Sequence, residues 1–160
     1  MTVPASDLTK SIQELEGVDW GEDTFGSYVT RTSHALRRKR LADLTAEEIR
    51  LGIGQQIGLP YLVPLALDPL WPDVFLEVAY FPGDLLTSML RVPPEFWTAH
   101  AAWRKRAEML ALQYFAQAAG DPEHSEVGLK AVRETYAQFA GQSAPNRWLR
   151  EKDTPPRAMN

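Results

Sequence analysis

Apolar residues recur at intervals of three and four along most of this chain, a spacing that places them on one face of an α-helix. No long stretch alternates apolar and polar residues as a half-buried β-strand does. A length of 160 residues is ordinary for one domain with one hydrophobic core. The pattern therefore predicts a mainly α fold, a single-domain compact helical bundle of about six to seven helices.

Several helix boundaries are marked by residues that cap free backbone groups. Thr45 and Glu48 have the spacing of a capping box, in which each side chain accepts the backbone N–H of the other residue. Gly17 stands where a left-handed residue closes a helix, and Pro60 and Pro94 suit first helical positions. The predicted helices cover about residues 7–16, 25–36, 46–57, 60–70, 84–90, 94–119 and 122–141. We expect the helix at 60–70 to be distorted near Pro64, and a buried extended segment is the alternative there.

Small and amide side chains around residue 55 carry two further expectations. Gly54 and Gly58 are four residues apart, which would let another helix approach closely. Gln55 and Gln56 stand within an apolar segment, so we expect buried amides whose hydrogen bonds fix the local geometry.

Residues 73–81 are the segment whose structure the pattern leaves open. Val74, Leu76 and Val78 nearly alternate, but their neighbours are also apolar except for Glu77. The pattern permits one short strand or extended segment near 73–81, and it also permits a loop.

The last helical pattern ends at Gly141, and the residues after it differ in character. Residues 142–160 contain three prolines and scattered charges, which predicts a flexible C-terminal tail after a helical domain of residues 1–141. The N-terminus has no basic and apolar leader, and no apolar run approaches the length of a membrane span. We therefore expect a soluble, cytoplasmic chain with no membrane contact.

Residues that carry chemistry are sparse in this chain. The absence of cysteine excludes disulfides, cysteine-ligated zinc and thiol catalysis. His34, His100 and His124 lie on different predicted helices, and none has a second histidine three or four residues away. The sequence therefore predicts no catalytic site, no bound metal and no cofactor.

Charge is distributed unevenly along the chain. The net charge is −4, yet residues 1–23 hold six acidic residues and one lysine, whereas residues 31–50 hold six basic and three acidic residues. An acidic domain disfavours nucleic-acid binding, because phosphate affinity comes from clustered basic charge. The dense basic run at residues 37–40 is typical of a helix C-terminus, where cations suit the negative dipole end. Its alternative interpretation is a nucleic-acid or anion site.

Five strings of residues occur in order along the chain. They are LEGVDWG at 15–21, RTSHALRRK at 31–39, LTAEEIRL at 44–51, IGQQIGLPYLVPLAL at 53–67 and FPGDLL at 81–86. Together they resemble the contact-dependent growth inhibition (CDI) immunity proteins of bacteria, the CdiI-like family. The resemblance covers residues 12 to about 97, and nothing after Trp97 contributes to it.

The resemblance implies a non-enzymatic antidote. Such a protein binds the C-terminal toxin domain of a cognate surface-delivered effector (CdiA) in the cytoplasm and blocks the active site of the toxin or its access to substrate. Toxins of the family are commonly nucleases, so we expect the partner to be a nuclease domain. The expected assembly is a 1:1 heterodimer with this domain. The alternative function is a nucleic-acid-associated regulator that uses the basic run at residues 37–40.

The resemblance does not identify the surface that binds the toxin. Strings shared across a family are expected to form its scaffold, and residues that select one toxin are expected outside them. Acidic side chains suit the basic groove of a nuclease, and exposed aromatic residues anchor interfaces. The candidate partner-binding residues are Asp19, Glu22 and Asp23 near the N-terminus, and Trp71, Asp73, Glu77, Tyr80 and Asp84 further along. Asp84 also suits a helix cap, and Trp20 is expected to fill a helix junction.

Overall fold

A computed structural model describes residues 2–121 and 126–142 of the chain. Within these residues it contains nine α-helices and one short 3₁₀-helix, which confirms the predicted mainly α fold. The elements are α1 (Ala5–Leu8), α2 (Ile12–Glu16), α3 (Tyr28–Arg38), the 3₁₀-helix η1 (Leu41–Asp43), α4 (Ala46–Gly54), α5 (Leu59–Leu70), α6 (Asp84–Leu90), α7 (Pro94–Ala99), α8 (Ala101–Ala119) and α9 (Glu126–Gly141).

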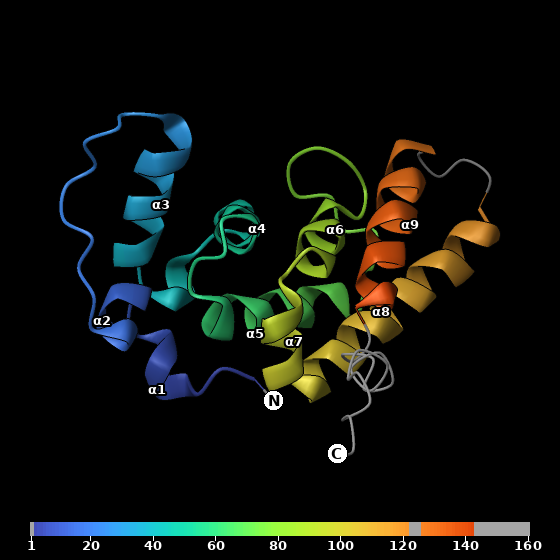
Figure 1. The fold of residues 1–160 in the computed structure, drawn as a ribbon, viewed down its shortest axis with the longest axis horizontal. Helices are drawn as coiled ribbons and strands as arrows, with labels where there is room; N and C mark the ends of the chain where they lie inside the picture. The colour runs from blue at the N-terminus through green and yellow to red at the C-terminus, as the bar shows by residue number, and fades with distance from the viewer. Residues whose placement is uncertain (1, 122–125, 143–160) are drawn as a thin grey trace, which may run out of the picture.

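Helix α5 lies at the centre of the arrangement (Figure 1). It crosses the middle of the molecule and packs against α4, α6 and α8. Helices α1 to α3 lie at one end of the molecule, and α8 and α9 lie at the other. Helix α6 packs against both α4 and α9, so the two ends are joined through the central helices.

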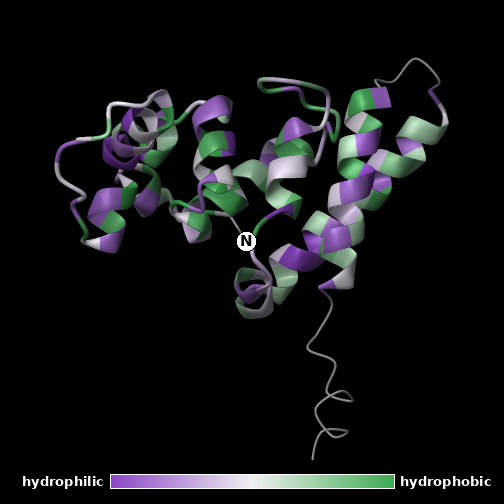
Figure 2. Ribbon diagram, turned by 45° about the horizontal axis from the view of Figure 1, so that its top comes forward, coloured by the Kyte–Doolittle hydropathy of each residue, from purple (hydrophilic) through white to green (hydrophobic). Residues whose placement is uncertain are grey.

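The side chains of α5 explain its central position. Five of its twelve residues have no exposed surface: Leu62, Val63, Ala66, Leu67 and Leu70. A helix buried on so many sides needs neighbours around most of its circumference. The outer helices instead carry both hydrophobic and hydrophilic residues, as expected for helices that bury one face (Figure 2). One cluster of buried side chains runs from Ile12 in α2 to Phe139 in α9.

Two of the seven predicted helices are interrupted, so the described residues form nine. The predicted helix 7–16 breaks before Ser11, whose hydroxyl accepts the Glu14 N–H while the Glu14 carboxylate accepts the Ser11 N–H. The predicted helix 94–119 breaks at His100, where φ is −127° and ψ is 57°. The three-and-four spacing of apolar residues continues across the first break, so periodicity alone did not reveal it.

Helix α3 begins three residues later than the sequence predicts. Gly26 has a left-handed backbone with φ of 69°, which does not continue a right-handed helix. The Ser27 side chain then accepts the Thr30 N–H and caps the helix that starts at Tyr28. Phe25, which the predicted helix at 25–36 includes, therefore lies in a loop.

Helix α4 ends at Gly54, three residues before its predicted end. Gln56 has φ of 58°, a left-handed backbone that is uncommon for a residue other than glycine. Gln55 and Gln56 are both exposed, so the expectation of buried amides was wrong. The turn after α4 directs these side chains outward while Ile57 is buried beneath them.

Residues 73–81 form a loop with turns. The described part of the chain contains no strand. Its β-type pairing is an isolated bridge between Ser11 and Arg40, far from this loop in the sequence. Of the two alternatives that the sequence left open for this segment, the loop is confirmed.

Part of the predicted C-terminal structure falls outside the described residues. Helix α9 is described from Glu126, so its predicted start at residue 122 is not described, and neither is the predicted tail after residue 142. Among the helices that are described, none combines the length and the hydrophobicity that a bilayer crossing requires.

Four described glycines lie so close to other residues that an added Cβ would come within 3.0 Å of them, and they are Gly52, Gly58, Gly83 and Gly128. A Cβ added to Gly58 would lie 2.7 Å from the Ile12 side chain, as expected, but one added to Gly54 would meet nothing within 4 Å. A Cβ added to Gly128 would lie 2.6 Å from the Pro82 carbonyl oxygen. Gly128 therefore allows α9 to pack directly on the backbone that precedes α6.

We expect Gly128→Ala to lower the free energy of unfolding by about 1–3 kcal/mol, because the added methyl group overlaps a backbone carbonyl that has no rotamer to escape into. Gly54→Ala is the matched control. Its Cβ position is open, and the higher helix propensity of alanine should raise the free energy of unfolding by up to about 1 kcal/mol. Urea unfolding followed by circular dichroism measures both, and equal stability of the two variants would contradict this packing.

Candidate functional site

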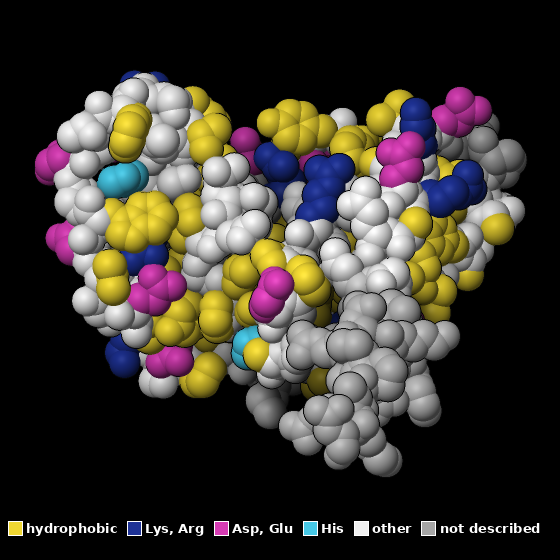
Figure 3. Space-filling model, viewed as in Figure 1, with side chains coloured by type: hydrophobic (Ala, Val, Ile, Leu, Met, Phe, Trp, Pro, Cys, Tyr) yellow, Lys and Arg dark blue, Asp and Glu magenta, His cyan; other side chains and the backbone are white. Residues whose placement is uncertain are grey.

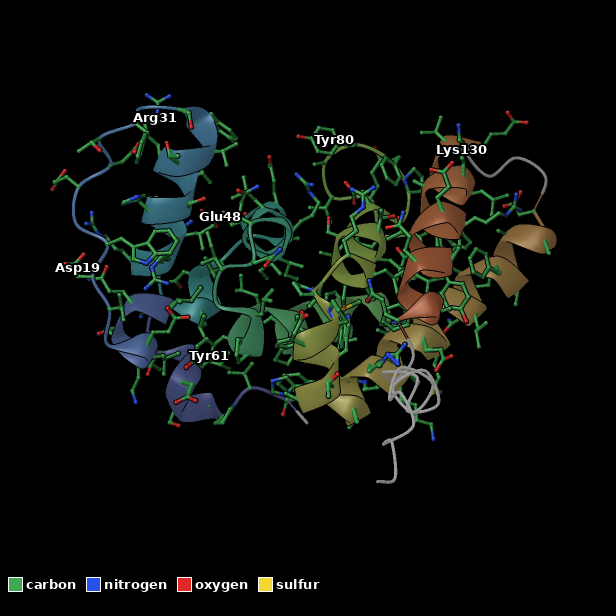
Figure 4. The ribbon with its side chains drawn as sticks, in the orientation of Figure 1. Asp19, Arg31, Glu48, Tyr61, Tyr80 and Lys130 are labelled. Atoms are coloured by element: carbon green, nitrogen blue, oxygen red, sulfur yellow. The ribbon has the colours of Figure 1, made fainter. Side chains whose placement is uncertain are left out.

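The residues singled out from the sequence lie in two loops. Asp19, Glu22 and Asp23 belong to the α2–α3 loop, residues 17–27, and the others belong to the α5–α6 loop, residues 71–83, or directly follow it. Figure 4 places Asp19 on the outer side of the N-terminal helices and Tyr80 on the loop above α6. The structure therefore brings these residues together into two separate groups.

A buried arginine holds the α2–α3 loop against α3. Arg37 is 2% exposed, and its guanidinium donates hydrogen bonds to Glu16 Oε2 at 2.6 Å and to the Val18 carbonyl oxygen at 2.8 Å. Its Cζ atom also lies 4.2 Å from the centroid of the Trp20 ring, a cation–π distance. Trp20 thus covers the junction between α2 and α3, although it remains partly exposed.

A second set of contacts fixes the next part of this loop. Arg38 donates a hydrogen bond to the Gly21 carbonyl oxygen at 2.6 Å and lies 3.7 Å from an Asp19 carboxylate oxygen. His34 Nδ1 lies 3.2 Å from the same Gly21 carbonyl oxygen. The Asp19 carboxylate in turn accepts the Gly21 N–H at 2.8 Å. Asp19 is therefore exposed but takes part in shaping the loop.

Asp23 shapes the end of the loop, whereas Glu22 is free. The Asp23 carboxylate accepts the N–H groups of Phe25 and Gly26 and the hydroxyl hydrogen of Thr30. Desolvation acts to raise the pKa of Asp23, but these hydrogen bonds outweigh it and hold the pKa below its ordinary value. Glu22 is exposed and has no hydrogen bond or ion pair within the part of the chain that the structure describes.

Large hydrophobic side chains are exposed in the same segment. Five of them lie within twelve consecutive residues, and we call them the N-terminal patch: Val18, Trp20, Phe25, Tyr28 and Val29. Sequence reasoning missed Phe25, Tyr28 and Val29 as surface residues, because their spacing of three and four matched a buried helix face. The signal that could have found them is Gly26 beside Ser27, which favours a helix start after Phe25.

The basic run at residues 37–40 is paired within the chain. Arg37 contacts Glu16 and Arg38 contacts Asp19, as described above. Lys39 Nζ lies 2.8 Å from Glu48 Oε1, and Arg40 Nε lies 2.6 Å from Asp43 Oδ2. All four cations therefore have a carboxylate neighbour, and the run ties α3 to the segments on either side of it.

Buried Asp84, at the start of α6, holds the backbone of the α5–α6 loop. Its side chain is 2% exposed, and its carboxylate accepts the backbone N–H groups of Val78, Ala79 and Tyr80 at 2.8–2.9 Å. These donors cannot then pair with a neighbouring strand, which accounts for the loop at residues 73–81. Asp84 is the first residue of α6, as predicted, and does not lie on the surface.

The remaining candidates of this loop are exposed. Trp71, Asp73, Glu77 and Tyr80 all lie at the surface, and Tyr80 is 72% exposed. Arg50 Cζ lies 4.6 Å from the centroid of the Tyr80 ring. This loop therefore offers aromatic and acidic side chains, with Tyr80 already beside a cation of its own chain.

Groups that could bind a metal ion do not assemble in the described residues. Among these residues no cluster of three or more His, Cys, Asp or Glu side chains could hold a metal ion. The His34 ring meets the edge of Trp20, and the His100 ring stacks on Trp103 at 4.4 Å between centroids. His124 lies outside the described residues. The arrangement suits binding through surface side chains.

Comparison with known proteins identifies one relationship. A family model described as CDI immunity proteins matches residues 14–107, more than half of the chain. The matched segment runs from α2 into α8 and includes both candidate loops. No curated protein and no solved structure matches the chain.

We expect Asp84→Ala to lower the free energy of unfolding by about 3 kcal/mol, because it leaves three backbone N–H groups without their charged acceptor. Asp73→Ala, which removes an exposed carboxylate that accepts only the Phe75 N–H, is the control and should cost under about 1 kcal/mol. Hydrogen exchange of the amides of residues 78–80 is the second measurement. Unchanged protection there would contradict the role given to Asp84.

The Glu48 carboxylate should contribute to acid sensitivity. Partial burial acts to raise its pKa, but hydrogen bonds from Lys39 and the Thr45 N–H outweigh burial and lower the pKa below 4.5. A carboxylate whose pKa is lowered on folding stabilises the protein at pH values above its unfolded-state pKa. This stability is lost as the pH falls through the folded-state pKa. Glu48→Gln should therefore be less stable than wild type near pH 7, with the difference shrinking below about pH 4.5 in urea unfolding.

Proposed function

We propose that this chain, which belongs to the family of CDI immunity proteins, binds the C-terminal toxin domain of a cognate CDI effector and neutralises it in the cytoplasm. The family assignment carries the general function, immunity against a CDI toxin. The single observation behind it is the family match over residues 14–107. The more specific statements below concern the toxin, the mode of inhibition and the contact surface.

A nuclease is the toxin that the charge of this chain suits best. The net charge is −4, and the substrate groove of a nuclease must be basic to hold phosphates. Complementary charge speeds association and selects the partner, both of which an antidote needs. We propose that the immunity protein acts without catalysis, in a 1:1 complex, by covering the active site of the toxin or its substrate entrance.

Two surfaces are candidates for the contact. One is the α2–α3 loop, with Asp19, Glu22 and Asp23. The other is the exposed part of the α5–α6 loop, with Trp71, Asp73, Glu77 and Tyr80. Asp84 is not part of this proposal, because its carboxylate is buried and bound to the loop backbone.

The alternative, a nucleic-acid-associated regulator that uses residues 37–40, has less support. Phosphate binding through this run would compete with carboxylates that already neutralise each cation. For Arg37 the competition is strongest, because its guanidinium is buried and has two acceptors. We therefore expect no nucleic-acid binding at ordinary ionic strength.

Co-expression with the toxin domain encoded directly upstream of its gene tests the proposed function. We expect this chain to restore growth of cells that make the toxin, and to co-purify with it as a 1:1 complex. A nucleic-acid-associated regulator would not produce both growth rescue and a 1:1 complex. Rescue without a complex, or a complex with no rescue, would contradict neutralisation by direct binding.

A further inference from the structure

We infer that the partner docks on the N-terminal patch, and that a lysine or arginine side chain of the partner enters a hollow between Trp20 and Phe25. This inference rests on the proposed function and chooses between its two candidate surfaces. It names anchor residues that the acidic side chains alone did not indicate.

Half of the ten large hydrophobic side chains that are exposed in the described chain belong to the N-terminal patch. Phe25 is 82% exposed and Tyr28 is 62% exposed, although both are large aromatic side chains. Trp20, Val18 and Val29 extend the same patch. Exposed apolar groups that gather in one place, with polar groups at their edge, are typical of protein interaction sites. In Figure 3 hydrophobic side chains surround a histidine at the N-terminal end of the molecule, and acidic side chains lie along its outer edge.

The patch contains a hollow of about 280 Å³. Its principal lining residues come from three segments, the α2–α3 loop, α3 and the turn after α4: Trp20, Phe25, Val29, His34, Gln55 and Ile57. The volume lies just below the range of about 300–1,000 Å³ typical of small-molecule pockets and is large enough for one side chain. A concave apolar site within an exposed aromatic patch is the geometry in which interface anchors bind most strongly.

The walls of the hollow are held in place before any partner binds. Trp20 packs between the Arg37 guanidinium, 4.2 Å from its ring centroid, and the His34 ring, 5.4 Å between centroids. The Phe25 backbone is fixed by its N–H, which donates to Asp23 Oδ1 at 3.0 Å. A preformed site loses less conformational entropy on binding than a mobile loop would.

Charge indicates which side chain the hollow accepts. Residues 17–29 contain three carboxylates, Asp19, Glu22 and Asp23, and no cation. The Asp23 carboxylate contacts Thr30, which also lines the hollow, so negative charge lies at its rim. A lysine or arginine stem can pack on the Phe25 ring, since the Trp20 ring already faces Arg37, while its cation reaches the Asp23 carboxylate. A basic nuclease surface supplies such side chains.

The test measures binding of the co-encoded toxin domain to the purified full chain by surface plasmon resonance. Phe25→Ala should weaken binding at least about tenfold, mainly through faster dissociation, as expected for an anchor residue. Val127→Ala is the matched control, because Val127 is a 65% exposed hydrophobic residue on α9, away from the patch. Thermal unfolding should be nearly the same for both variants, because neither side chain is buried.

A second pair of variants tests the charge argument. Glu22→Lys should slow association several-fold and reduce its dependence on salt, because Glu22 is an exposed carboxylate in the loop segment between Trp20 and Phe25, the two aromatic residues that line the hollow, and it has no partner in the described chain. Glu108→Lys changes the net charge equally at an exposed position on α8 and should leave association nearly unchanged. The pair separates local charge from the net charge of the protein.

The outcomes distinguish this inference from the proposed function. The inference is supported if the wild-type protein binds the toxin domain, Phe25→Ala binds it at least about tenfold more weakly, and Val127→Ala binds it as the wild type does. If Phe25→Ala and Glu22→Lys both bind the toxin domain as the wild type does, the inference is overturned and the proposed function stays intact. Loss of binding in Tyr80→Ala alone would assign the contact to the α5–α6 loop. Absence of wild-type binding would overturn the inference and the proposed function together.

Discussion

The burial of α5 is the constraint on which the rest of the structure depends. A helix with apolar side chains around most of its circumference is stable in water only when other helices cover it, and burial of each large aliphatic side chain contributes about 1.5–3 kcal/mol. Helices α4, α6 and α8 provide this cover. Because α6 is one of them, the α5–α6 loop is positioned by the requirement to cover α5, whereas the α2–α3 loop is positioned through α3, which packs against α4.

Two buried charged side chains then give those loops defined shapes. Arg37 donates to a carboxylate and a carbonyl oxygen at the start of the α2–α3 loop, and Asp84 accepts three N–H groups from the α5–α6 loop. A charge taken out of water is costly unless it is fully hydrogen-bonded. The loop backbone supplies all three hydrogen bonds of Asp84, whereas Arg37 donates to the Glu16 carboxylate and to the Val18 carbonyl oxygen, and its buried Nε has no partner in the described chain. Disorder of either loop would take hydrogen bonds away from a buried charged group.

Sequence patterns that repeat along a helix predict the fold, whereas single residues that end or begin a helix are missed. The helical periodicity identified the helices and most of the core, and the capping box at Thr45 is present as predicted. Periodicity failed at the ends of helices, where one residue such as Gly26 or Ser11 changes the backbone direction. It therefore assigned Phe25 to the core. The exposed hollow could not be predicted, because its walls come from three segments that only the tertiary packing brings together.

The positions of the five family-like strings support the division between scaffold and contact surface. Arg37 and His34 belong to the string at residues 31–39, and their partners Val18, Trp20 and Gly21 belong to the string at 15–21. The two strings therefore bind each other. The segment between them, residues 22–30, contributes Phe25 and most of the N-terminal patch. A rigid frame that holds a short exposed segment can accommodate a different partner through changes in that segment alone, because the contacts that order the frame lie outside it.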